Sequence, residues 1–192
     1  DVKFMYEILN NYVPFNEQER IDKKAMITFI ENNSDVLNRS NLIAHMTSSA
    51  IVLNEAMDKV LFAHHNIYNA WGWVGGHNDG DDDCLHVAIK EAKEETGIEH
   101  VYPFNNDILG IDIIHVSNHI KNGLFVSDHL HLNVTYLLIA DELDELEISH
   151  HENSGVKWFE LDGILDTVEE ERMKPVYKKL FDKAQKLKND RI

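Results

Sequence analysis

The pattern of apolar and polar positions predicts helices at both ends of the chain. Residues 16–33, NEQERIDKKAMITFIENN, are polar with scattered apolar positions. Those positions recur at the spacing of one helix face, which predicts a helix in a helical N-terminal extension over residues 1–41. The C-terminal segment 168–188, VEEERMKPVYKKLFDKAQKLK, predicts a second helix with Pro175 near its start or at a kink. The predicted inward face of the first helix consists of Ile21, Ala25, Ile27 or Thr28, and Phe29.

The middle of the chain is rich in strand-like segments separated by turn residues. NEAMD at 54–58 resembles a hairpin connection between the first two segments. Residues 129–141, HLHLNVTYLLIAD, alternate between an apolar and a polar face. The apolar face of this segment comprises Leu130, Leu132, Val134 and Tyr136, and the polar face comprises His129, His131, Asn133 and Thr135. The strand-like segments are 45–54, 57–65, 70–76, 107–117, 129–141 and 156–164.

One helix interrupts these strands, and its ends are well marked. Asp82 or Asp83 is suited to cap its N-terminus, and Gly97 is a typical C-terminal residue, so we predict a helix from about residue 83 to about residue 96. Its apolar stripe comprises Leu85, Ala88, Ile89, Ala92 and Thr96. Strands around a central helix, with further helices at the ends, predict an α+β fold in which helices pack against a mixed sheet. We divide the chain into the extension 1–41 and a domain 42–192.

Charge and composition narrow the class of partner. The chain has 192 residues and a formal net charge of −16, so broad nucleic-acid binding is not expected. The single cysteine, Cys84, excludes an internal disulfide, which favours a reducing cytoplasmic location. Apolar runs are only a few residues long, and no signal peptide is recognisable, so we expect no membrane association.

Three glutamates share one face of the central helix. Glu91, Glu94 and Glu95 stand at i, i+3 and i+4, which is also the arrangement of an ordinary solvated acidic face. A preceding strand ends at Gly75 and Gly76, and an acidic loop then leads into the helix. A carbonyl near the glycines together with the carboxylates would suit a hard cation such as Mg²⁺, which prefers oxygen ligands.

The register of these residues resembles the Nudix box. Gly76 is followed after five residues by Asp82 and after seven more by KEAKEETGI, so Glu91, Glu94, Glu95, Gly97 and Ile98 match the motif. Asp82 replaces the usual glutamate, and Lys90 replaces the usual arginine; both keep the charge. The surrounding segments, from about 43 to 165, also resemble a MutT-like Nudix domain. They include HHENSGVKWFELDGI at 150–164, which is similar to the strand with a glutamate and then a tryptophan near the end of many such domains.

This resemblance implies a Nudix-type α/β/α sandwich around a mixed sheet. It also implies an Mg²⁺- or Mn²⁺-dependent hydrolase that cleaves a nucleoside diphosphate linked to another group, by attack of water at phosphorus. The implied metal ligands are the Gly75 carbonyl, Glu91, Glu94 and Glu95. Glu91 is our preferred general base, and Glu94 also counts among the candidate catalytic residues.

Further candidates lie outside the glutamate helix. Glu152 is a loop acid of the kind that family members bring to the metal or use as a base, and Glu147 is a lesser candidate. Trp73, His77 and Lys90 are candidate substrate contacts, although His77 and His86 are also typical of surface histidines. His129 and His131 resemble the start of a cupin metal motif, but the acid that should follow is missing, so the polar face of a strand is the better interpretation.

Two other functions remain open. A catalytically silent Nudix-fold module that binds a nucleotide would keep the fold and lose turnover. A relative of isopentenyl diphosphate isomerase would need a cysteine on a strand, whereas Cys84 lies next to the helix. Substrate choice would depend on the loop 119–128 and on the N-terminal extension, and a homodimer is possible.

Overall fold

A mixed β-sheet forms the centre of the protein. The computed structural model describes residues 1–191. The strands lie in the order β10-β2-β1-β9-β5, while β3 pairs with β2, β4 with β1, and β6 with β9. β1 and β9 pair in parallel from Ala44 opposite Leu130 to Asn54 opposite Ala140, and the other neighbouring strands of this sheet are antiparallel. The strands are β1 (Ala44–Asn54), β2 (Lys59–His65), β3 (Ala70–Gly72), β4 (Val74–His77), β5 (Val101–Pro103), β6 (Gly110–Val116), β9 (His129–Ala140) and β10 (Asn153–Glu160).

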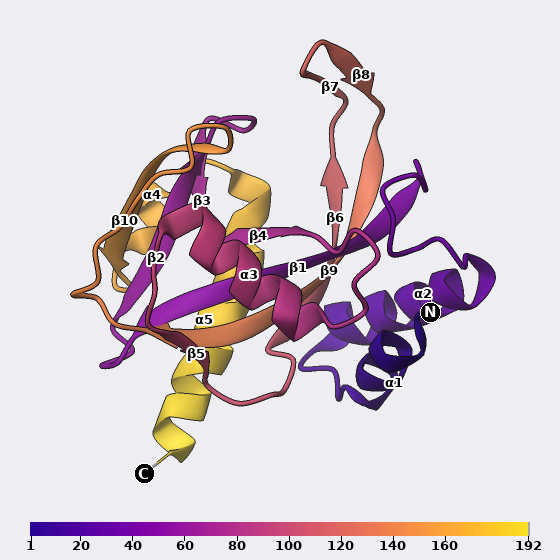
Figure 1. Cartoon of the computed structure of the whole chain (residues 1–192). Coiled ribbons are helices and arrows are strands. Elements are labelled where there is room, and N and C mark those ends of the chain that lie inside the picture. Colours follow the sequence, from indigo (N-terminus) through magenta and orange to yellow (C-terminus); the bar gives the residue numbers. More distant parts are fainter. Residues whose placement is uncertain (192) are drawn as a thin grey trace.

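Helices cover both faces of this sheet, as predicted. Figure 1 shows α3 (Cys84–Thr96) in front of the sheet and α5 (Lys174–Asp190) behind it. Because strand side chains alternate, Ala50 and Val52 of β1 face the core on the α3 side, and Ile51 and Leu53 face the core on the α5 side. A short helix α4 (Ile164–Thr167) and a 3₁₀ turn η1 (Glu171–Met173) lead into α5, whose first turn contains Pro175.

The N-terminal extension contains two helices, α1 (Lys3–Asn11) and α2 (Glu17–Asn32). Asn16 caps α2 by accepting a hydrogen bond from the backbone N–H of Glu19. The predicted apolar face of α2 is partly right, because Ile27 and Phe29 pack against the core, whereas Ile21 is 47% exposed and the buried residues are Glu19, Met26 and Ile30. Apolar residues occur on more than one side of this helix, and contacts with the sheet and α5 decide which side is buried.

A buried ion network fixes α2 to the sheet and to α5. Lys179 Nζ lies 3.0 Å from Glu19 Oε2 and 2.8 Å from Asp112 Oδ1. It also donates to the backbone carbonyl of Ile111 at 3.0 Å. Met5, Leu9, Met26 and Ile30 belong to the same apolar cluster as the sheet residues on the α3 side, so the extension packs against the sheet. Its status as a separate unit stays a prediction.

A small hairpin projects from the sheet between the end of β6 and the start of β9. β7 (His119–Lys121) and β8 (Leu124–Val126) pair only with each other, and Figure 1 shows them standing away from the body of the molecule. Ile120, Leu124 and Phe125 are exposed there. This hairpin falls within the predicted specificity loop 119–128. Within residues 1–191, no helix combines the length and the apolar character needed to cross a membrane.

Candidate metal centre

The helix that carries the glutamates begins and ends where its sequence predicts. Asp83, rather than Asp82, caps α3, because its Oδ1 accepts the backbone N–H of His86 at 3.1 Å. Gly97 ends the helix with a φ of 76°, a left-handed conformation that favours glycine. Ala88 and Ala92 are fully buried against the sheet. The helix is thereby held with Glu91 and Glu95 next to β4.

Two glycines of β4 allow the strand to approach these carboxylates closely. The backbone N–H of Gly75 donates a hydrogen bond of 2.8 Å to Glu95 Oε2. A Cβ atom added to Gly76 would lie only 2.4 Å from Glu91 Cδ. Any larger residue at position 76 would therefore displace the Glu91 carboxylate. Gly76 is therefore a steric requirement of the site, and a Cβ atom on Gly75 would instead meet Ser49 of β1.

Three carboxylates from two distant segments meet at this place. Carboxylate oxygens of Glu91, Glu95 and Glu152 all lie within 4.8 Å of one another. Glu152 comes from the loop before β10, and its backbone carbonyl accepts the N–H of Asn66 at 3.0 Å. The structure therefore brings the predicted loop acid to the predicted helix acids.

Their crowding makes the carboxylates hard to ionise. Burial, followed by repulsion from Glu94 and Glu152, raises the pKa of Glu91 to about 7. Burial also raises the pKa of Glu95 well above its ordinary value, against the effect of the Gly75 hydrogen bond. The Glu95 side chain is unusual for a helix acid because only 4% of the residue is exposed. A divalent cation would offset this repulsion, so the donor set fits Mg²⁺ or Mn²⁺.

The remaining acids and the lysine of the motif lie at the edge of the cluster. Glu94 and Lys90 are exposed, and their charged groups lie 3.9 Å apart. Glu94 therefore faces solvent beside the three clustered glutamates. Asp82 is in the loop just before α3. Glu147 contacts the C-terminal end of α3, where its N–H donates to the Thr96 carbonyl at 2.8 Å.

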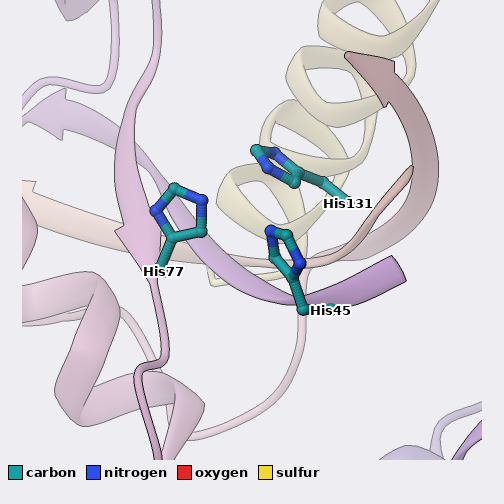
Figure 2. A group of neighbouring side chains, drawn as sticks. All are labelled: His45, His77 and His131. Carbon is teal, nitrogen blue, oxygen red and sulfur yellow. The ribbon is translucent and has the colours of Figure 1, made fainter. Parts of the chain in front are cut away.

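The predicted substrate contacts have different surroundings. Trp73 packs edge-on against Tyr177 of α5 at 5.5 Å between ring centroids, and its carbonyl is 2.6 Å from His65 Nε2. His77 was expected at the surface, but it is half-buried and lies beside His45 and His131 (Figure 2). The strand packing that surrounds His77 is long-range and is not visible in the local sequence. Cys84 is buried, and its Sγ accepts a hydrogen bond from the Asn78 side chain at 3.4 Å.

Sequence reasoning did not identify a polar network on the face of the sheet that points away from α3. Thr47 and Ser49 of β1 donate hydrogen bonds to Asn133 Oδ1 at 2.8 and 2.9 Å. Asn133 in turn donates to Thr135 Oγ1 at 3.1 Å. The alternation of β9 indicated a polar face there, but its partners on β1 could be found only from the strand pairing.

Comparisons with known proteins agree on the fold. The family model described as NUDIX domain matches residues 44–180. A Caenorhabditis elegans Ap4A hydrolase in a binary complex is similar to this chain with a TM-score of 0.55 and 19% identity, over 76% of this chain and 98% of the other. A hydrolase of the NUDIX family from Clostridium perfringens has a TM-score of 0.50 and 19% identity, over 72% and 96%. No curated protein sequence gives a significant match.

Proposed function

Because the chain belongs to the Nudix family, we propose that it hydrolyses the diphosphate linkage of a nucleoside diphosphate joined to another group. The observation that carries this proposal is the cluster of Glu91, Glu95 and Glu152 against the glycines of β4. A shallow acidic surface would not need a glycine at position 76, nor would it bury Glu95.

The three clustered glutamates would hold Mg²⁺ or Mn²⁺. The Gly75 carbonyl and Glu94 would be further ligands, since the Gly75 N–H already contacts Glu95 and Glu94 precedes Glu95 on the helix. A bound divalent cation would neutralise the diphosphate and lower the pKa of a bound water. The Gly75 N–H orients Glu95 by fixing one of its oxygens. Glu95 therefore serves as an anchored ligand rather than as a mobile base.

We assign the general base to Glu91, with Glu152 as the second candidate. Glu91 is only half-buried and lies within 4.8 Å of both other carboxylates, whereas Glu95 is buried and held by the Gly75 N–H, so Glu91 is the better placed of the two to accept a proton. Attack of water on one phosphorus breaks its bond to the bridging oxygen. The proton of the water passes to the carboxylate, and two phosphate-terminated products leave.

Activity on a substrate panel tests this proposal. The panel contains nucleoside diphosphate sugars, dinucleotides and Ap4A, each with Mg²⁺ or Mn²⁺, and the products are identified by chromatography. We expect Glu91→Gln to lower kcat by about 10²–10⁴-fold, the usual contribution of general acid–base catalysis. Glu95→Gln should lower the affinity for the metal as well, so that activity needs a higher Mg²⁺ or Mn²⁺ concentration. Glu147→Gln serves as the control, because this acid lies outside the cluster, and it should keep wild-type activity.

Two results would contradict the proposal. Full activity in both Glu91→Gln and Glu95→Gln would exclude this cluster as the active site. Tight binding of a nucleotide without turnover, for every metal and substrate of the panel, would favour the silent binding module instead.

A further inference from the structure

Three histidines from three different strands meet on the face of the sheet opposite to α3. They are His45 of β1, His77 of β4 and His131 of β9, and Figure 2 shows their rings turned toward one another. One ring nitrogen of each lies within 4.8 Å of those of the other two. The ring centroids are 5.2 Å apart for His45 and His77, 5.2 Å for His45 and His131, and 5.0 Å for His77 and His131.

Strand pairing produces this cluster. β1 and β9 place His45 directly opposite His131, and β1 and β4 place Thr47 opposite His77. Successive strand residues point to opposite faces, so Gly76 faces Glu91 while His77 faces the histidines. The histidine cluster and the carboxylate cluster are therefore separated by the sheet itself.

One hydrogen bond fixes the tautomer of His45. His45 is 4% exposed, and its Nδ1 lies 3.0 Å from the Asn41 carbonyl, which makes Nδ1 the protonated nitrogen. Its Nε2 then carries a lone pair, and it has no hydrogen-bond partner among residues 1–191. Metal-binding histidines commonly donate their other ring nitrogen to a backbone carbonyl in this way.

His129 extends the cluster, and a backbone carbonyl orients its ring in the same way. Its Nδ1 lies 2.8 Å from the Ser127 carbonyl, and its Nε2 lies 3.2 Å from His131 Nε2. Two nitrogen ligands of tetrahedral Zn²⁺, each about 2.0–2.1 Å from the metal, are separated by about 3.4 Å. The His129–His131 spacing is thus close to that of two ligands. The three central rings would need to approach one another by on the order of 1 Å.

Burial, more than the charges around the cluster, keeps these imidazoles neutral. Burial, Arg39 and the neighbouring histidine lower the pKa of His77 to about 3, and burial and the other histidines lower that of His131 to about 2. The Arg39 guanidinium is itself paired with Asp79 at 2.7 Å. Neutral imidazole is the form that binds a metal. The donors are all nitrogen, so the site would select a borderline transition metal over Mg²⁺.

We propose that His45, His77 and His131 form a second metal site that binds Zn²⁺, with a fourth position that is open to His129 or to an exogenous ligand. Three histidines with one further position are a frequent arrangement for this ion. His77 and His131 are half-buried, so the cation can reach the site from solvent. The proposal needs none of the glutamates and stands independently of the proposed hydrolase activity.

Zinc and cobalt binding to the tag-free, chelator-treated protein test this site. The titrations contain excess Mg²⁺, which competes with Zn²⁺ for carboxylate ligands. We expect one Zn²⁺ per chain, an increase in Tm on binding, and a Co²⁺ complex with the visible spectrum of tetrahedral nitrogen ligation. His131→Gln and His77→Gln should each weaken Zn²⁺ binding by at least about 100-fold, since loss of an outer-shell partner alone costs about 10–100-fold.

His115→Gln is the matched control. His115 lies on the neighbouring strand β6 with an exposed side chain, so its removal should leave Zn²⁺ affinity and the Co²⁺ spectrum unchanged. The Tm of each metal-free variant shows whether it remains folded. Failure of the wild-type protein to bind Zn²⁺ would refute the site. So would equal Zn²⁺ affinity in wild type and in folded His131→Gln and His77→Gln, whatever the hydrolase assays show.

Discussion

Replacing Lys179 with methionine should strongly destabilise the fold, because this lysine is the cation of a buried network. Its side chain is 8% exposed, and those of Glu19 and Asp112 are 0% and 5% exposed. Methionine keeps most of the volume and removes the charge. Glu19 would still accept hydrogen bonds from Tyr12 and from the backbone of Phe15 and Ile111. Asp112, by contrast, would lose its cation, and its Oδ2 already has no hydrogen-bond partner among the described residues.

Removing one partner of a buried ion pair typically costs about 3–5 kcal/mol, a large share of the roughly 5–15 kcal/mol that stabilises a protein. Burial raises the pKa of Asp112 to about 6 even with Lys179 present. Without the lysine, the pKa of both Glu19 and Asp112 rises in the folded state. The folded variant then binds protons more tightly than the folded wild type, so its loss of stability is smaller at pH 5 than at pH 8.

Urea unfolding followed by tryptophan fluorescence at pH 5 and pH 8 measures both effects. Adding Asp112→Asn to Lys179→Met should recover part of the lost stability at pH 8, since the uncompensated charge is gone. The control is Lys178→Met, whose lysine is 65% exposed and pairs with Asp182 on the surface; it should cost at most about 1 kcal/mol. A loss below about 1 kcal/mol for Lys179→Met, or a loss that is larger at pH 5, would refute this reasoning.

Two further substitutions test how the glutamates are positioned. Asp83→Ala removes the cap of α3 and should lower the free energy of unfolding by about 0.5–2 kcal/mol, measured by urea denaturation, while Asp82→Ala should change it less; equal losses would argue against the assigned cap. Gly76→Ala should displace Glu91 and abolish most of the proposed metal-dependent activity. Circular dichroism checks that this variant is folded, and a folded variant with wild-type kcat would show that the close contact is unimportant.

The sequence predicted those elements whose signals are local. The two ends of α3 could be assigned because Asp83 and Gly97 act on the backbone beside them. The two faces of β9 could be assigned because alternation is a property of one strand. The mixed sheet with helices on both faces followed from the order of such elements and from the Nudix resemblance, and the structure confirms it.

Features that depend on contacts between distant segments could not be predicted from the sequence. The burial of Glu19 on α2 could not be predicted, because its partner Lys179 lies far along the chain. His45 was not singled out, and His131 was interpreted as part of a polar strand face. Only the register between β1, β4 and β9 brings these rings together. Glu95 was among the predicted metal ligands, but its burial and its hydrogen bond from the Gly75 N–H follow only from the packing of β4 against α3.

The alternation of Gly76 and His77 along β4 has a consequence for how this chain can change. A one-residue slip of β4 against β1 would exchange the faces of Gly76 and His77. The His77 imidazole would then point at Glu91, where there is no room even for one added Cβ atom. Insertions or deletions within β4 should therefore be poorly tolerated, whereas length changes in the exposed β7–β8 hairpin should be accepted readily. One short strand thus fixes the position of a residue in each of the two clusters, Gly76 against Glu91 and His77 beside His45 and His131.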